Sequence, residues 1–350
     1  MSFENKKNHG VERSGDGREN AKFLSAEQSA GIREAVQRLI DSLAKVIAGK
    51  DDILRLVCVG LLADGHILLD DVPGTGKTTL ARAMAKSLGV KFARVQFTPD
   101  LLPSELSGIN YYRSDTNQFE FRPGAVFTNI LLADEINRAT PRTQSSLLEC
   151  MQEKQVSVDG VTYELAEPFW VIATQNPLET LGTFPLPEAQ LDRFMMRLSL
   201  GYPDKEAERV MLRRFRSDSP LDTLEPVLSG AELLKLRRLC RDVYVAPVVE
   251  DYLLAIVRET RESAELQLGA SPRALLALRR AAQVLAAIEG AVYVSPDHVA
   301  KLAVPVLAHR IIPRSSFLEQ TRALSEGIIA DIVAAVPVPT EAYTLPEWRN

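Results

Sequence analysis

Hydrophobic residues follow two different periods along this chain, and the change from one to the other divides it. Between residues 25 and 203, short apolar runs typical of buried strands alternate with segments whose apolar residues recur every three or four positions, as on helices. From residue 204 onward only the helical period continues, over about 204–216, 230–242, 248–262, 272–289, 296–308 and 316–334. The pattern predicts an α/β domain followed by an all-α domain.

The first domain combines five apolar runs with two hairpins. The predicted strands are 66–69, 90–97, 129–133, 169–174 and 196–200. Helical segments separate them, which favours a parallel sheet sandwiched by helices. The segment 107–127 and the segment 155–166, which contains Asp159-Gly160 between alternating runs, predict β-hairpins inserted into this core.

The two ends of the chain lack this patterning. Residues 1–24 are polar and without periodicity, so we expect a disordered tail. Residues 337–350 form a Pro-containing C-terminal tail. Single hydrophobic cores rarely extend beyond about 250–300 residues. The 350 residues of this chain therefore support a division into two domains, 25–203 and 204–336.

Composition restricts the class of protein. The formal net charge is −5, which argues against a nucleic-acid backbone as the main partner. Cys58, Cys150 and Cys240 are far apart in apolar helical segments, which indicates reduced core residues. The sequence contains neither an apolar run of about 18 residues nor a signal-peptide pattern, so we expect a cytoplasmic protein without membrane insertion.

The strand 66–69 runs into a Gly-rich turn and a helix, which is the local pattern of a phosphate-binding loop. Glycines allow the backbone to approach phosphate oxygens at the positive end of the helix dipole. Lys77 is expected to reach the β- and γ-phosphates, and the Thr78 hydroxyl to bind Mg²⁺. The predicted nucleotide-binding residues are Val72, Pro73, Gly74, Thr75, Gly76, Lys77, Thr78 and Thr79.

Two further features of this region are Asp71 and the apolar segment 46–49. The strict motif has Gly where this chain has Asp71, and because that position only opens the turn, we expect the difference to be minor. The apolar segment 46–49 fits the floor of an adenine pocket, and an ordinary helix end at Gly49 is an equally good and compatible interpretation.

Polar residues end two of the other strands. Asp134 and Glu135 follow the strand 129–133, where Asp134 is placed to hold Mg²⁺ and Glu135 to polarise the attacking water. Asn176 follows the strand 169–174 and places a carboxamide level with the γ-phosphate. Arg138 and Arg142 either face a subunit interface or are solvated.

Five segments taken together resemble the MoxR family of AAA+ ATPases. They are Gly-Thr-Gly-Lys-Thr (74–78), Leu-Leu-Ala-Asp-Glu-Ile-Asn-Arg-Ala (131–139), Ala-Thr-Gln-Asn-Pro (173–177), Pro-Leu-Pro-Glu-Ala-Gln-Leu-Asp-Arg-Phe (185–194) and Gly-Ala-Ser-Pro-Arg-Ala (269–274). The resemblance covers about residues 26–312. Many members of the family also carry Asp at the first position of the loop.

The resemblance implies a P-loop AAA+ core with a helical lid, and roles for further residues. Asn176 matches the sensor 1 position, and Arg193 matches the arginine finger that reaches the ATP of the neighbouring subunit. Arg273 matches sensor 2, which closes the lid onto the γ-phosphate of its own subunit. It also implies an ATPase that uses ATP and Mg²⁺, forms a homo-oligomer, most simply a hexamer, and matures client proteins in a chaperone-like role with a von Willebrand factor A domain partner.

Two other classes of function share parts of this pattern. A DNA-associated AAA+ ATPase, such as a helicase loader, has the same core and hairpins but requires Lys or Arg at the hairpin tips. The tips here, 114–117 and 159–160, are acidic or neutral. A nucleotide-dependent scaffold requires neither Glu135 nor Arg193, since binding alone uses no catalytic base or finger.

Overall fold

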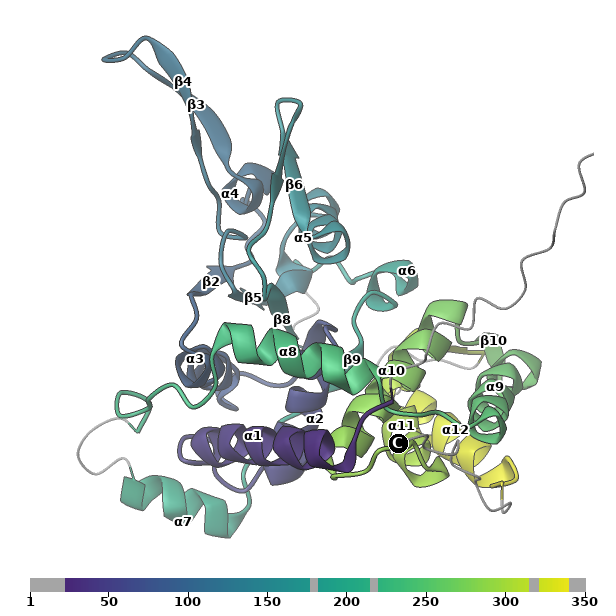
Figure 1. Ribbon diagram of the computed structural model, residues 1–350. Helices are drawn as coiled ribbons and strands as arrows, with labels where there is room; N and C mark the ends of the chain where they lie inside the picture. The colour runs from purple at the N-terminus through teal and green to yellow at the C-terminus, as the bar shows by residue number, and fades with distance from the viewer. Residues whose placement is uncertain (1–22, 177–181, 215–219, 315–320, 340–350) are drawn as a thin grey trace, which may run out of the picture.

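The computed structural model describes residues 23–176, 182–214, 220–314 and 321–339, and its elements are labelled in Figure 1. The described part confirms the predicted α/β core and helical lid. The expected tail 1–24, except its last two residues, and the residues from 340 onward lie outside the described residues. Pro177 and the start of the predicted helix 316–334 lie outside them too.

A five-stranded parallel sheet forms the centre of the core, with the strand order β2-β5-β8-β1-β9. β8 lies between β1 and β5, so the strand that precedes the Gly-rich loop does not pair with the strand that carries the acidic pair. The carboxyl ends of all five strands therefore meet at one edge of the sheet. The strands are β1 (Ile67–Asp70), β2 (Phe92–Gln96), β5 (Ile130–Asp134), β8 (Trp170–Gln175) and β9 (Met196–Leu198).

Side chains of each strand alternate between the two faces of the sheet. Ile67 and Leu69 of β1 join the apolar cluster under the helices α1 (Ala26–Ala44), α2 (Asp51–Leu62) and α3 (Lys77–Leu88). Leu68, between them, faces the cluster that contains Leu147 and Leu148 of α5 (Pro141–Glu153). Because both faces are covered, the central strands β1, β5 and β8 are buried and mostly apolar along their length.

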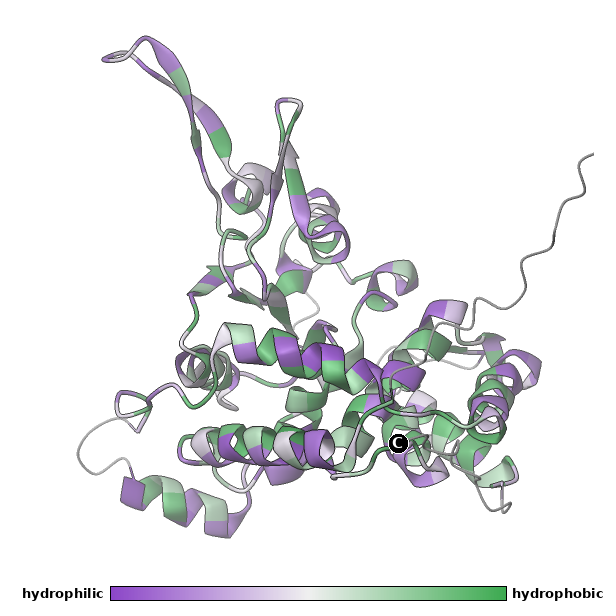
Figure 2. Cartoon of the chain, viewed as in Figure 1, coloured by the Kyte–Doolittle hydropathy of each residue, from purple (hydrophilic) through white to green (hydrophobic). Residues whose placement is uncertain are grey.

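Both predicted hairpins are present, and they extend away from the sheet in the same direction (Figure 1). They are β3 (Ile109–Arg113) with β4 (Gln118–Arg122), and β6 (Gln155–Val158) with β7 (Val161–Glu164). Phe121 stacks on Tyr163 with ring centroids 4.0 Å apart, which ties one hairpin to the other. The strands alternate in hydropathy along the hairpins (Figure 2).

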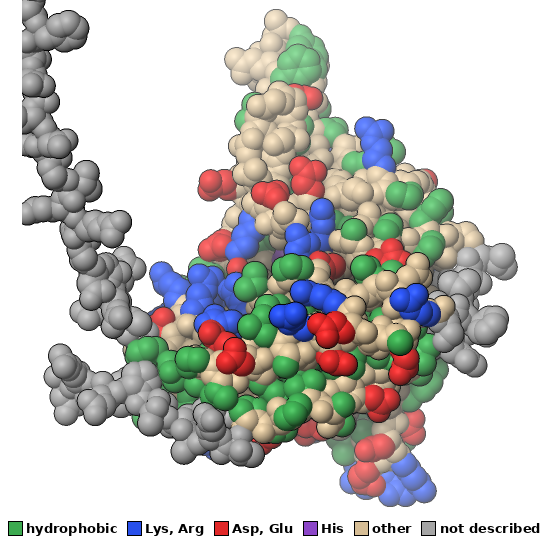
Figure 3. Space-filling view, turned by 90° about the vertical axis from the view of Figure 1, so that its right-hand side faces the viewer, with side chains coloured by type: hydrophobic (Ala, Val, Ile, Leu, Met, Phe, Trp, Pro, Cys, Tyr) green, Lys and Arg blue, Asp and Glu red, His purple; other side chains and the backbone are tan. Residues whose placement is uncertain are grey.

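The outer part of the first hairpin exposes aromatic side chains. Phe119 is 74% exposed and Tyr112 is 53% exposed. Figure 3 shows hydrophobic side chains near the far end of this projection. A short helix, α4 (Pro103–Ser107), lies at the base of the same hairpin.

The chain leaves the core after β9 and continues as helices. They are α7 (Lys205–Arg214), α8 (Gly230–Arg241), α9 (Pro247–Glu262), α10 (Pro272–Ile288), α11 (Pro296–Leu307) and α12 (Thr321–Ala335). The lid also contains an antiparallel pair, β10 (Leu266–Leu268) with β11 (Ile312–Pro313). The prediction of an all-α domain omitted this pair because strands of two or three residues are too short to show a period.

No helix in the described part of the chain is both long and apolar enough to cross a membrane. The three cysteines are buried and unbonded, and burial raises the pKa of each thiol to about 12. They therefore remain protonated and pack as apolar core residues.

His66 fixes the start of β1 and is expected to make folding pH-dependent. Its Nδ1 accepts a hydrogen bond from the Val171 N–H at 2.9 Å, and its Nε2 lies 3.0 Å from the Met151 carbonyl oxygen. This arrangement needs a neutral ring, and burial lowers the pKa of His66 from 6.5 to about 4. His66 therefore stabilises the fold fully above about pH 6.5, and this contribution is lost as the pH falls toward about 4.

The lost contribution amounts to at most about 3 kcal/mol. We expect the free energy of unfolding, measured by urea denaturation, to fall between pH 6.5 and 4. The His66→Gln variant keeps one donor and one acceptor but does not titrate, so its decrease should be shallower. Equal decreases in both proteins would contradict this assignment.

Candidate functional site

The Gly-rich loop connects β1 to α3 and has a backbone that only glycine adopts readily. Gly74 has φ +85° and Gly76 has φ +92°, in the left-handed region. Lys77 begins α3, and its ammonium group donates to the carbonyl oxygens of Asp71 at 2.6 Å and Val72 at 3.1 Å. The lysine thus lies folded over its own loop, at the end of the helix that carries the positive dipole.

A pocket of about 360 Å³ lies between this loop and the carboxyl ends of β2, β5 and β8. It brings together residues from four segments that are far apart in the sequence. Its lining residues are Pro73, Gly74, Gly76, Lys77, Thr78, Thr79, Arg94, Gln96, Asp134, Glu135 and Asn176. Val72 and Thr75 do not line it, although Val72 accepts from Lys77. Most of the predicted site is therefore assembled by the strand order.

Asp134 ends β5 and is held on two sides. Its Oδ1 accepts from the Thr174 hydroxyl at 2.7 Å, and its Oδ2 accepts from the Arg94 guanidinium at 2.7 and 3.1 Å. Thr174 belongs to β8, which separates β5 from β1. These bonds fix the carboxylate at the floor of the pocket.

Glu135 has a strained backbone, with φ +55° and ψ +51°. A non-glycine residue in this region costs free energy, and such residues cluster at functional sites. Its N–H donates to Thr174 Oγ1 at 2.8 Å. Its Oε2 accepts from Gln96 Nε2 at 2.6 Å and from Arg138 Nη1 at 3.0 Å. The carboxylate is therefore oriented by two donors before any ligand enters.

Arg94 and Gln96 are site residues that the sequence analysis missed. They are alternate residues of β2, and Gln96 is in register with Asp134 of the neighbouring strand β5. Arg94 Nη2 also donates to Gln96 Oε1 at 3.0 Å, so one guanidinium supports both acidic residues. Two polar residues on the same face at the carboxyl end of a predicted strand could have indicated a site. Only the pairing of β2 with β5 shows that they contact the acidic pair.

A second, more apolar pocket of about 570 Å³ adjoins the same loop. Val46, Ile47 and Ala48 line it, together with Thr75 of the loop and Met211 of α7. Of the two interpretations of the segment 46–49, the position beside the loop supports the floor of a base pocket. The first helix after the core, α7, supplies the opposite wall.

Asp71 does more than open the turn. Its carboxylate accepts hydrogen bonds from Ser199 Oγ at 2.6 Å, Leu200 N at 2.6 Å and Gly201 N at 2.9 Å. The expectation of a minor role is therefore wrong, because the carboxylate joins the loop to the segment that follows β9.

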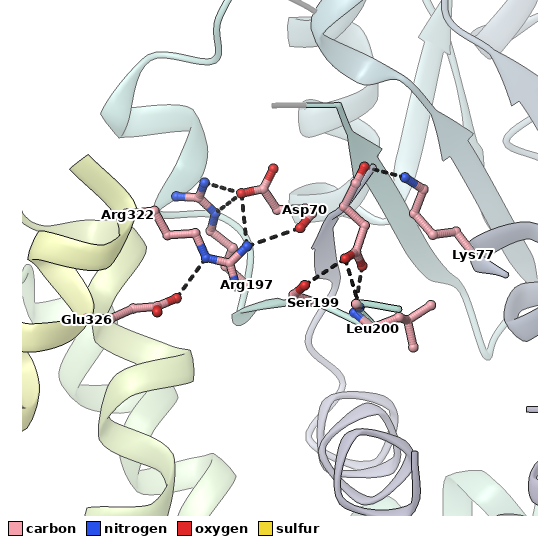
Figure 4. Close-up of polar contacts among 9 residues, drawn as sticks. Asp70, Lys77, Arg197, Ser199, Leu200, Arg322 and Glu326 are labelled. Carbon is pink, nitrogen blue, oxygen red and sulfur yellow. Dashed lines mark hydrogen bonds and ion pairs between the residues drawn. The ribbon is translucent and has the colours of Figure 1, made fainter. Parts of the chain in front are cut away.

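Asp70, the residue before it, joins the loop to the lid (Figure 4). Its buried carboxylate accepts from the guanidinium of Arg197 on β9 and pairs with Arg322 of α12 at 3.3 Å. The Arg322 guanidinium also donates to the Asp70 carbonyl oxygen at 3.1 Å. The loop is thus fastened to β9 and to the last helix of the lid by two consecutive acidic residues.

Restoring the strict motif with Asp71→Gly is expected to destabilise the protein. The change leaves the amide groups of Leu200 and Gly201 without their acceptor, which costs about 3 kcal/mol in total. Thermal unfolding should show a transition lowered by several degrees. Asp71→Asn, which keeps one acceptor oxygen, should lose less, and a Gly variant as stable as the wild type would refute this role.

The structure does not bring Arg193 or Arg273 to the pocket within one chain. Neither residue lines it, and neither side chain makes a hydrogen bond or ion pair with a described residue. Instead the two are near each other, because Ser271, two residues before Arg273, donates to Asp192 at 3.0 Å. The expected closure of Arg273 onto its own subunit's nucleotide is therefore not what this arrangement presents.

The chemistry of the pocket fits a nucleotide with a bound Mg²⁺. Thr78 and Asp134 line one pocket and offer the hard oxygen atoms that Mg²⁺ prefers. The described residues contain no cluster of three or more His, Cys, Asp or Glu side chains suited to a metal.

Comparisons with known proteins agree with this site. Residues 66–196 match the model of the ATPase family associated with various cellular activities (AAA), and residues 258–332 match that of the AAA lid domain.

Relatives align over most of the chain. The uncharacterized protein YeaC of Bacillus subtilis is 47% identical over 87% of this chain and 95% of its own length. Chaperone MoxR1 of Mycobacterium tuberculosis is 40% identical over 82% and 78%. A solved structure from Cytophaga hutchinsonii is 38% identical, has a TM-score of 0.81, and aligns over 90% of this chain and 98% of that one.

Proposed function

The chain belongs to the MoxR family of AAA ATPases, which hydrolyse ATP, and on that basis we propose that it forms a ring, most simply a hexamer, that remodels a client protein. One observation carries the proposal of a ring. The nucleotide pocket of a single chain holds the loop and both acidic residues, but neither of the two arginines. A second copy supplies what is missing.

Within the pocket each residue has a defined task. Lys77 leaves the two carbonyl oxygens of its own loop and binds the β- and γ-phosphates. Thr78 and Asp134 hold Mg²⁺, which when bound neutralises charge on the phosphate oxygens. Arg94 is the cation that balances Asp134 in the structure, so it must move aside or share that carboxylate.

Glu135 and Asn176 prepare the attacking water. Gln96 and Arg138 already orient the Glu135 carboxylate, which lines the pocket beside Asp134. Asn176 follows β8, between the loop and Asp134, and its carboxamide orients the same water. Glu135 accepts the water's proton as the water attacks the γ-phosphate.

Arg193 and Arg273 complete the pocket of the neighbouring subunit. A planar guanidinium presents several donors to phosphate oxygens and stays charged, which suits the charge that develops during phosphoryl transfer. We assign both arginines this role in trans. The observation behind it is their common position beside Asp192, away from the lining of their own pocket.

The two hairpins and the lid transmit the reaction to other proteins. Phe119 and Tyr112 give the outer hairpin an exposed aromatic surface suited to protein contact. The proposed client role follows the relative named chaperone MoxR1, and the family resemblance implies a partner with a von Willebrand factor A domain.

The arrangement disfavours the alternative DNA-associated function. Arg113, near the tip of the first hairpin, is paired with Asp115 and with Glu120 at 3.0 Å. At the second tip, Asp159 accepts from Asn110 of the first hairpin at 2.8 Å. Because Asp115 and Glu120 both pair with Arg113, the tip of the first hairpin has no surplus positive charge to bind phosphates.

Mixing two inactive variants tests the ring. Lys77→Ala subunits lack a working pocket but keep both arginines, and Arg193→Ala subunits keep the pocket. Where a Lys77→Ala subunit lies beside an Arg193→Ala subunit, an intact pocket of the latter receives the intact arginines of the former. Hydrolysis should therefore return in mixed rings. Arg273→Ala mixed with Lys77→Ala should behave in the same way. No recovery at any mixing ratio would exclude action in trans.

A further inference from the structure

Asp192 joins the core to the lid close to the backbone of both arginines, Arg193 and Arg273. It follows α6 (Glu188–Leu191), and its carboxylate accepts from the Ser271 hydroxyl, with both oxygens 3.0 Å away. Its Oδ1 also pairs with Arg310 Nη1 at 3.4 Å. Ser271 and Arg310 both belong to the lid, so one carboxylate of the core contacts two separate lid segments.

Ser271 is itself fixed in place. It is the N-cap of α10, where its Oγ accepts from the Ala274 N–H at 3.1 Å while its proton is donated to Asp192. A hydroxyl has one donor and can accept as well, so both bonds coexist. The first turn of α10, which carries Arg273, is therefore held against Asp192.

Arg310 binds the backbone of Phe194, the residue after Arg193. Its side chain is 1% exposed, and its Nη2 donates to the Phe194 carbonyl oxygen at 2.6 Å. The ring nitrogen Nε2 of His309 lies 3.0 Å from the same oxygen. Burial lowers the pKa of Arg310 to about 10, with Asp192 opposing this shift and the positive charge of Arg273 adding to it. The charge of Arg273 is therefore close enough to act on this cluster.

The side chains of Arg193 and Arg273 contrast with these anchored neighbours. Arg193 directly follows Asp192, and Arg273 lies two residues after Ser271. Neither guanidinium makes a hydrogen bond or ion pair with any residue that the structure describes. Their backbones are tied together through one carboxylate, while their charged ends remain available for a ligand.

We propose that Asp192 is a positioning residue that holds Arg193 and Arg273 as one unit, so that movement of the lid moves both toward or away from the neighbouring subunit's nucleotide. The inference rests on the proposed action of these arginines in trans. Its physical basis is that a buried cation and a capped helix share a single anionic partner. Removing that charge leaves Arg310 buried without its counter-ion and frees the α10 end from the turn.

Asp192→Asn is the test variant, because asparagine keeps the size and one acceptor oxygen but removes the charge. We expect its rate of ATP hydrolysis to fall about 10²-fold, as for a displaced catalytic group. Its affinity for a fluorescent ATP analogue, measured at equilibrium, should stay within about twofold of the wild type. Sedimentation should show the same assembly, since the change does not touch the nucleotide pocket.

Mixing experiments then assign Asp192 to one half of the site. Asp192→Asn mixed with Lys77→Ala should recover hydrolysis, because the first supplies pockets and the second supplies intact arginine pairs. Asp192→Asn mixed with Arg193→Ala should not recover, because every subunit then lacks a working pair. Recovery in the second mixture, or its absence in the first, would overturn the role of Asp192.

The reference mixture of Arg193→Ala with Lys77→Ala separates this inference from the proposal beneath it. If that mixture fails, action in trans is wrong and the inference falls with it; if it recovers, the Asp192 result decides alone. Ser271→Ala guards against misfolding of the Asn variant. It removes the hydrogen bond to Asp192 from the lid side and should lower the rate of ATP hydrolysis about tenfold. Like Asp192→Asn, it should recover hydrolysis when mixed with Lys77→Ala but not when mixed with Arg193→Ala. A different result for Ser271→Ala in either mixture would contradict the proposal.

Discussion

Replacing Arg193 with alanine is expected to slow ATP hydrolysis by about 10³- to 10⁵-fold, while ATP still binds with nearly unchanged affinity. The loss is large because a guanidinium supplied by a neighbour neutralises charge that develops on the transferred phosphoryl group. The affinity is preserved because the phosphate loop and Asp134, which line the pocket, are unchanged, and Arg193 acts on charge that develops only during the reaction. Single-turnover hydrolysis and equilibrium binding of ATP measure the two quantities separately.

Arg193→Lys is the matched control for this prediction. Lysine keeps the positive charge but lacks the planar set of donors, so its rate should lie between those of the wild type and the alanine variant. A loss of ATP affinity equal to the loss of rate would show that Arg193 binds ATP before the reaction and does not act on the developing charge. A rate within tenfold of the wild type would remove it from the reaction.

Glu135→Gln is expected to bind ATP and to hydrolyse it about 10²- to 10⁴-fold more slowly. A carboxamide cannot accept the proton of the attacking water, whereas its size still fits beside Gln96 and Arg138. The phosphate loop and Asp134 are unchanged, so binding remains. Glu149→Gln, an exposed position on α5, serves as the control and should hydrolyse ATP like the wild type.

The same variant tests the client role. Held with ATP, Glu135→Gln rings should retain a bound client that is absent from Lys77→Ala protein, which cannot enter the ATP state. Crosslinking at Phe119 would show whether the exposed hairpin makes that contact. Wild-type turnover by Glu135→Gln would instead remove Glu135 as the base, and identical bound proteins in both samples would argue against capture driven by ATP.

Much of the fold and of the pocket was predictable because the signals are local. A buried strand, a Gly-rich turn and a helix occur within about 20 residues, and the left-handed backbone at Gly74 and Gly76 explains why glycine stands there. Asp134, Glu135 and Asn176 end apolar strands, and parallel strands bring such ends to one edge. Most of the predicted loop residues, the acidic pair and Asn176 accordingly line one pocket.

Other features depend on pairings that the sequence does not display. Arg94 and Gln96 gain a role only because β2 lies beside β5. Asp71, which departs from the motif, is a structural acceptor for the chain after β9, more than 125 residues away. No local pattern distinguishes such a residue from a neutral substitution.

The sequence by itself determined the α/β core with its helical lid, the family and most of the residues that line the pocket, because strand and helix periods and a phosphate loop are properties of contiguous residues. Only the tertiary structure decided where Arg193 and Arg273 lie. They are 80 residues apart in the sequence, and a carboxylate, a hydroxyl and a buried guanidinium from three segments bring them together. Contacts between distant segments follow from packing of the whole chain, which the order of residues along one segment does not reveal.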